Sequence, residues 1–208
     1  MRYIPIFTLG ALLVAGTAHA IENLPASCHS PTGQAAKLQC DLDRADQVAE
    51  RSDDIYGYTA KPIVRIVDTD SPSGSAYVYD IVDANGTLLL DARSVPESTA
   101  GGSAPIPACR LQRQLPDNVA NKVALSLLFA AEPAVPAYGK REKMVINADG
   151  SRSYELLLTS HDIITRIETV DGMRDFSRHA EATDKIADLN RSVIGVANFS
   201  DGWVCKTN

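Results

Sequence analysis

The sequence has few aromatic residues (6%), only four cysteines and no excess of positive charge. Apolar residues still make up 45% of the 208 positions, which is too many for a disordered chain. Lys and Arg number 20 against 26 Asp and Glu. This acidic balance argues against nucleic acid as a partner, because neutralising phosphates requires a basic surface. Four cysteines are too few for a small disulfide-dense scaffold, so we expect a globular protein with its own core.

Long apolar runs are absent except at the N-terminus. Arg2 precedes an apolar stretch from Ile4 to Ala15, and Ala18-His19-Ala20 places small residues at the −3 and −1 positions of a cleavage site. This pattern is typical of a secretory signal peptide, and the stretch is too short to span a bilayer well. An uncleaved membrane anchor is the alternative.

We therefore predict a signal peptide at residues 1–20 and a single domain at 21–208, located in the periplasm or secreted. Cleavage removes one basic residue and no acidic one, so the formal charge changes from −6 to −7. No later run reaches the ~18 apolar residues of a transmembrane helix, so we expect no membrane span in the mature chain.

All four cysteines follow the predicted cleavage site, and an even number in an oxidising compartment indicates two disulfides. On the expected first helix, Cys40 lies about 200° round from Leu38 and so points away from the apolar stripe, toward the lead-in that carries Cys28. Among three possible pairings we favour Cys28–Cys40 with Cys109–Cys205. Cys28 lies too far beyond the apolar stretch to favour lipid attachment.

Hydrophobic periodicity predicts three helices, at residues 31–51, 117–131 and 173–190. The turn dipeptides Asn85-Gly86 and Asp149-Gly150 predict two β-hairpins, because both supply the positive φ that a tight turn needs. The strands expected are 62–68, 76–83, 87–93, 143–148, 152–160, 162–170, 193–199 and 203–205, with a long loop at 94–108. We predict an α+β fold, a mainly antiparallel sheet with three helices packed on one face of it.

No strong catalytic motif is present in the sequence. His161 and Asp162 are adjacent, so on a strand their side chains point to opposite faces. His179 is expected on the surface of the third helix. Asp68 and Asp70 could bind a divalent cation, but such spacing is common in ordinary turns. We therefore predict no catalytic residue, no metal ligand and no cofactor.

Four of the seven tyrosines, Tyr56, Tyr58, Tyr77 and Tyr79, lie within 24 residues. Tyrosine is favoured where one side of a ring is apolar and the other is wet, as on a recognition surface. We predict that these four residues form a binding surface; the alternative is a strand face packed on a helix.

These observations favour an exported, disulfide-stapled binding or inhibitory module that recognises a protein or a small ligand. The partner would be a protein of the cell envelope or of the medium. A hydrolase whose carboxylates are assembled only by the fold is the alternative, and an envelope-assembly component is a third interpretation. Catalysis is less favoured than binding, because no motif supports it.

Overall fold

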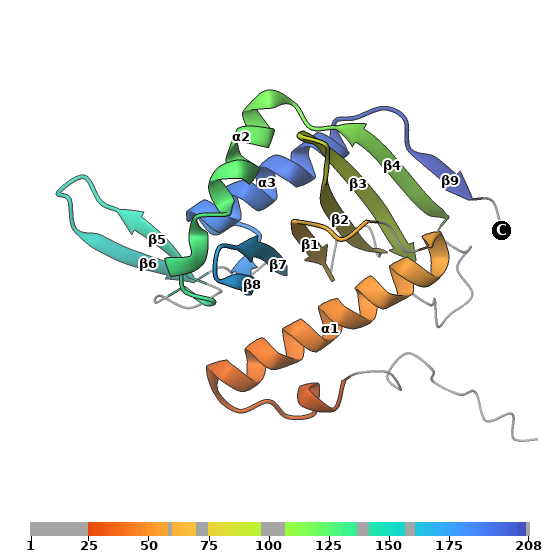
Figure 1. Cartoon of the computed structure of the whole chain (residues 1–208). Helices are drawn as coiled ribbons and strands as arrows, with labels where there is room; N and C mark the ends of the chain where they lie inside the picture. The colour runs from red at the N-terminus through yellow and green to blue at the C-terminus, as the bar shows by residue number, and fades with distance from the viewer. Residues whose placement is uncertain are drawn as a thin grey trace, which may run out of the picture.

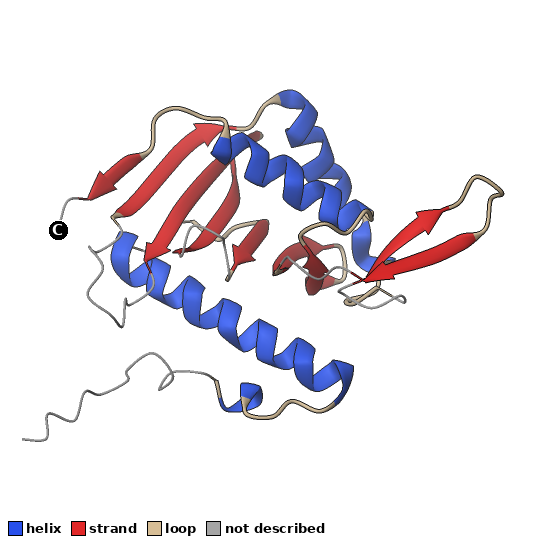
Figure 2. Ribbon diagram, turned by 180° about the vertical axis from the view of Figure 1, so that it is seen from behind, coloured by secondary structure: helices blue, strands red, loops and turns tan. Residues whose placement is uncertain are grey.

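A computed structural model describes residues 25–57, 60–69, 75–96, 107–136, 142–156 and 161–206. They form a seven-stranded sheet with helices on both faces and a separate two-stranded hairpin that projects to one side (Figures 1 and 2). The strand order is β8-β7-β1-β2-β3-β4-β9, and every described pairing is antiparallel. The predicted α+β class is confirmed. The predicted signal peptide, 1–20, lies outside the described residues.

The helices are α1 (Gly33–Tyr56), α2 (Asp117–Ser126) and α3 (Lys185–Asn198), with short 3-10 turns η1 (Ala26–Cys28) and η2 (Phe129–Ala131). The strands are β1 (Val64–Asp68), β2 (Ser75–Ala84), β3 (Thr87–Pro96), β4 (Ala108–Gln114), β5 (Glu142–Ile146), β6 (Arg152–Leu156), β7 (Asp162–Thr169), β8 (Gly172–His179) and β9 (Val204–Lys206). Among the described helices, none is long and apolar enough to cross a membrane.

The helices lie on opposite faces of the sheet, so the expectation that they share one face was wrong. On β2, Val78 packs in a cluster with α1, while the adjacent Tyr79 packs in the larger cluster with α2 and α3. Successive side chains of a strand point to opposite faces, and here both are buried. Both faces of the central strands are therefore buried, one beneath α1 and the other beneath α2 and α3.

The helix predicted at 173–190 was wrong. Residues Gly172–His179 form β8, which pairs with β7, and α3 begins only at Lys185. Asp184 caps α3 by accepting a hydrogen bond from the backbone N–H of Ala187 at 2.9 Å. The strand predicted at 193–199 therefore falls almost entirely within α3. Buried apolar residues of α3 recur every three or four positions, as a packed helix requires: Ile186, Leu189, Val193 and Ala197.

The loop predicted at 94–108 is shorter than expected, because β3 continues to Pro96 and β4 starts at Ala108. Strand β4 was not predicted. Past Leu111, which is buried, its side chains are exposed, so the sequence has only a weak strand pattern there. Both predicted disulfide pairings are confirmed: Cys28–Cys40 ties η1 to α1, and Cys109–Cys205 joins β4 to β9.

Candidate functional site

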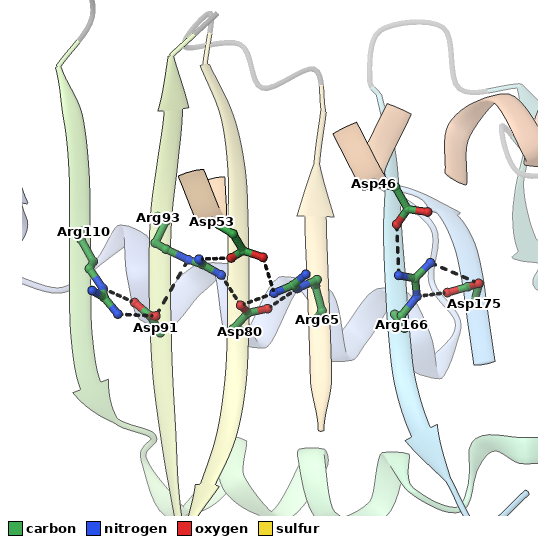
Figure 3. Close-up of polar contacts among 9 residues, drawn as sticks. All are labelled: Asp46, Asp53, Arg65, Asp80, Asp91, Arg93, Arg110, Arg166 and Asp175. Carbon is green, nitrogen blue, oxygen red and sulfur yellow. Dashed lines mark hydrogen bonds and ion pairs between the residues drawn. The ribbon is translucent and has the colours of Figure 1, made fainter. Parts of the chain in front are cut away.

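A line of arginine and aspartate side chains crosses the sheet on the face beneath α1 (Figure 3). Strands β1 to β4 and the helix all contribute to it, and positive and negative groups alternate along it. We call it the arginine–aspartate network; its members are Arg110, Asp91, Arg93, Asp53, Asp80 and Arg65.

Arg93 lies at the centre of the network and is fully buried. Its Nη1 donates a hydrogen bond to Asp53 of α1 at 2.7 Å, and its Nη2 donates one to Asp80 of β2. Arg65 of β1 donates two more hydrogen bonds to Asp80, at 2.6 and 2.8 Å. A buried carboxylate is thus held between two guanidinium groups, and α1 is joined to the sheet through the same cluster.

Arg110 closes the other end of the network by donating two hydrogen bonds to Asp91, at 2.7 and 2.8 Å. These bonds raise the pKa of Arg110 above its ordinary value. Burial acts to lower the pKa of Arg65, but the hydrogen bonds and the negative charge of Asp80 outweigh it, and that pKa is also raised. Both guanidinium groups are therefore held firmly in their charged form.

A second ion-pair cluster lies beside the network, one strand further along the sheet (Figure 3). Arg166 of β7 donates a hydrogen bond to Asp175 of β8 at 2.6 Å and another to Asp46 of α1 at 3.0 Å. Asp46 and Asp53 are seven residues apart, so they lie on one side of the helix. The fully buried residues of α1 are all small, namely Ala45, Ala49 and Ser52, and the half-buried Leu42, Val48 and Ile55 pack around them.

Each carboxylate of the two clusters forms an ion pair with a guanidinium group, so the arrangement fastens α1 to the sheet and does not offer a general base. The sequence analysis missed it. A signal was present, because Arg65 stands within the apolar stretch Ile63–Val67 and Asp80 stands between Val78 and Val82. A charged residue inside a buried strand requires a partner of opposite charge.

The predicted tyrosine surface is divided between the two faces of the sheet. The rings of Tyr77 and Tyr79 stack with centroids 6.0 Å apart on the α3 face, and Tyr79 is only 2% exposed. The hydroxyl of Tyr56, on α1, lies within hydrogen-bond distance of the carbonyl oxygens of Ser94 and Cys109. Tyr58 lies outside the described residues. Contact of any of these tyrosines with a partner stays a prediction.

Tyr77 lines a pocket of about 310 Å³ between the central strands and the end of α3. Trp203, the only tryptophan in the sequence, packs edge to face against the Tyr77 ring, with centroids 6.4 Å apart and planes at 80°. The indole N–H of Trp203 donates to the carbonyl of Ala197 at 3.1 Å, which fixes the ring. The described lining residues are Ser75, Tyr77, Ser94, Pro107, Cys109, Asn198 and Trp203.

Ser75 gives this pocket a buried polar group. The residue is 2% exposed, and its hydroxyl has no hydrogen-bond partner among the described residues. The neighbouring hydroxyl of Ser94 accepts from the backbone N–H of Cys109 at 2.8 Å and keeps a second lone pair. None of the described lining residues carries a charge. Of these residues the sequence singled out Tyr77 as a binding residue and Cys109 only as a disulfide partner, because the fold brings the lining together.

The histidines and aspartates considered above occupy one end of the sheet. Nε2 of His161 lies 3.0 Å from the buried carboxylate of Asp68. His179 is fully buried at the end of β8, opposite Asp162, so its predicted place on a helix surface was wrong. Asp70 lies outside the described residues. Within the described ranges, no group of three or more His, Cys, Asp or Glu side chains could hold a metal ion.

A larger cavity of about 470 Å³ lies between α2 and α3 and is lined mainly by apolar side chains. Leu125 and Leu128 at its edge are 58% and 69% exposed. The charged groups around it are already engaged with one another: Lys122 with Asp188 at 2.7 Å, and Lys185 with Glu132 at 3.3 Å. The polar groups of this cavity are thus charged side chains paired at its edge, and none of its described lining residues has a buried polar group without a partner.

The β5–β6 hairpin carries a second exposed apolar area (Figures 1 and 2). Its pairing places Met144 opposite Tyr154, with Ile146 and Leu156 on the same face. Tyr154, Ile146 and Leu156 are all more than half exposed. An apolar face of this kind is typical of a surface that contacts another protein, and the sequence analysis did not single out this hairpin.

Comparisons with family models, with curated proteins and with solved structures find no match to this chain. The function is therefore argued from the geometry of the protein itself.

Proposed function

We propose that the protein works outside the cytoplasm as a binding module, and that the pocket lined by Tyr77 and Trp203 is its binding site. The leader pattern at residues 1–20 and the two disulfides support export, because disulfides persist in oxidising compartments. The observation that carries the proposal is the pocket, in which two aromatic rings meet a buried hydroxyl. Ligand sites are typically apolar hollows with a few placed polar groups.

The composition of the pocket favours a small, uncharged ligand. Burying a charge costs several kcal/mol unless an opposite charge receives it, and no described lining residue is charged. The cavity between α2 and α3 is larger, but it lacks a buried polar group among its described lining residues. Hydrophobic contact alone discriminates poorly between ligands, so we assign selective binding to the smaller pocket.

Trp203 makes the proposal directly testable, because a ligand in the pocket contacts the only tryptophan. The protein lacking residues 1–20 is titrated with a panel of small uncharged molecules while tryptophan fluorescence is recorded, and thermal unfolding is measured in parallel. We expect at least one compound to change the emission and to raise the Tm, since a ligand that binds only the folded state stabilises it.

The matched variants are Tyr77→Leu and Tyr154→Leu, which remove one aromatic ring each. Tyr77 lines the pocket, whereas Tyr154 lies exposed on the β5–β6 hairpin. We expect Tyr77→Leu to weaken binding and Tyr154→Leu to leave it unchanged. The proposal is wrong if no compound of the panel binds, or if both variants bind as tightly as the parent protein.

Hydrolysis is the second candidate function, and the His161–Asp68 contact favours it. A carboxylate that holds an imidazole is part of the usual arrangement of a general base. If this candidate is correct, a screen of ester, amide and glycoside substrates detects turnover, and His161→Asn lowers kcat by about 100-fold or more. His29→Asn, the same substitution at an exposed histidine before α1, serves as the control. Turnover that is unaffected by His161→Asn would remove this assignment.

A further inference from the structure

We infer that the ligand of the pocket lined by Tyr77 and Trp203 is a neutral sugar. This inference rests on the proposed binding function and names the chemical class that the pocket selects.

The two aromatic rings suit the apolar side of a sugar ring. The face of an aromatic ring carries partial negative charge, and the C–H groups of a pyranose, polarised by the neighbouring oxygens, carry partial positive charge. The rings of Tyr77 and Trp203 stand nearly perpendicular, at 80°. One ring can thus lie against the sugar face while the other borders its edge.

The polar groups of the pocket suit the hydroxyl groups of a sugar. Ser75 and Asn198 carry a hydroxyl and an amide group, which can both donate and accept hydrogen bonds. Sugar hydroxyls have the same double capacity. The hydroxyl of Ser94 already donates to the carbonyl of Pro107 and accepts from Cys109, so it can offer only its second lone pair. Ser75 is the strongest of these indications, because its buried hydroxyl has no partner within the described part of the chain. Such a group costs free energy when it is left unpaired and gains it when a ligand supplies a partner.

Other ligand classes fit less well. A phosphate, a carboxylate or an amine would bring a charge into a pocket whose described lining has none to receive it. A purely apolar ligand would fill the space but leave the hydroxyl of Ser75 without a partner. A neutral molecule with one apolar face and a rim of hydroxyl groups satisfies both requirements.

The test compares sugars with molecules that share only part of their chemistry. The protein lacking residues 1–20 is titrated with glucose, galactose and N-acetylglucosamine, and with cyclohexanol, benzyl alcohol and glucuronic acid. Trp203 fluorescence and calorimetry report binding. Cyclohexanol keeps a six-membered ring with one hydroxyl, and glucuronic acid adds a negative charge. We expect a neutral sugar to bind at least about tenfold more tightly than cyclohexanol or glucuronic acid. This ratio of Kd values corresponds to a difference of about 1.4 kcal/mol in binding free energy.

Two matched serine variants test the role of the buried hydroxyl. Ser75 and Ser177 both lie on strands of the sheet, both are buried, and neither hydroxyl has a partner among the described residues. Ser75 lines the pocket, whereas Ser177 lies on β8, which β7 and β1 separate from β2. We expect Ser75→Ala to raise the Kd for the sugar about tenfold and Ser177→Ala to leave it unchanged. Both variants should keep the parent Tm, because each loses only an unpaired hydroxyl.

The outcomes separate this inference from the function on which it rests. Tighter binding of cyclohexanol or benzyl alcohol than of every sugar overturns the sugar assignment but keeps the binding pocket. A sugar affinity that Ser75→Ala does not change also overturns it. If Ser75→Ala lowers the Tm, the Kd of Tyr77→Leu for the sugar is used instead. An unchanged Kd in that variant then overturns the sugar assignment. Failure of every compound to bind overturns both the inference and the proposed site.

Discussion

Arg93 and Asp80 are both fully buried and hydrogen-bonded to each other between α1 and the sheet. Taking two charges out of water costs several kcal/mol per ion, and their attraction offsets this only when further hydrogen bonds complete the site. Asp53 and Arg65 supply those bonds here. The pair is therefore stable as part of the network and would be costly as an isolated pair.

Removal of Arg93 tests this dependence. We expect Arg93→Met to lower the free energy of unfolding by about 3–5 kcal/mol, because it leaves the buried carboxylate of Asp80 with less positive charge. Chemical denaturation followed by circular dichroism measures the change. The control is Lys61→Met, which removes an exposed ion pair with Glu168 and should cost no more than about 0.5 kcal/mol. Equal effects of the two substitutions would show that the network contributes no more than a surface pair.

The two disulfides should differ in their contributions to stability. Cys109–Cys205 spans 96 residues and Cys28–Cys40 spans 12. In the chain-entropy model these loop lengths correspond to about 5 and about 3 kcal/mol. Replacing both cysteines of one pair with serine, followed by denaturant unfolding, gives each value. A larger loss from the short loop than from the long one would contradict this prediction.

Stability should fall in alkaline solution. Burial raises the pKa of Tyr56 and of Tyr79, and the charge of Asp68 raises that of Tyr79 further. A pKa raised in the folded state contributes stability that is complete below the unfolded value, about 10, and is lost as pH rises above it. Unfolding at pH 8 and pH 11 measures the loss. We expect Tyr79→Phe to reduce it, and an unchanged loss in that variant would exclude Tyr79 as its source.

The β5–β6 hairpin should exchange its amide hydrogens much faster than the central strands. No residue of β5 or β6 is buried, and a two-stranded hairpin is only marginally stable by itself. Hydrogen exchange followed by mass spectrometry compares its peptides with those of β2, which pairs on both sides. Equal protection of the hairpin and β2 in dilute solution would instead show that another molecule covers its apolar face.

Local signals predicted the parts of the fold that depend on neighbouring residues. Asn85-Gly86 and Asp149-Gly150 mark the two hairpins because a tight turn leaves a strong trace in sequence. The helix predicted at 173–190 failed because Met173, Phe176 and Ala180 fit a helical spacing by chance. Burial along β8 does not alternate, because its first four residues are exposed or half-buried and its last four are all buried, so no strand period marks it. Its pairing with β7 is not specified by the sequence of β8 alone.

The candidate site was harder to predict than the fold. Ser75 and Trp203 are far apart in sequence, and only the return of the chain after α3 brings them to one pocket. Tyr77 was singled out by composition, together with Tyr79, which is buried, and Tyr56, which lies on the other face. A cluster in sequence therefore identified one lining residue. The remaining lining residues became apparent only from the arrangement of the strand ends and α3.

The strand order has a consequence for the chain during its synthesis. Strand β1 pairs with β7 on one side, at Val64 and Ile167, whereas its other neighbour, β2, follows directly. Because the N-terminal part is made first, strands β1 to β4 exist before β7, and β1 is then an open edge that another chain can join. A fragment ending at residue 136 would keep this edge of β1 unpaired, and we expect it to aggregate more readily than the whole chain.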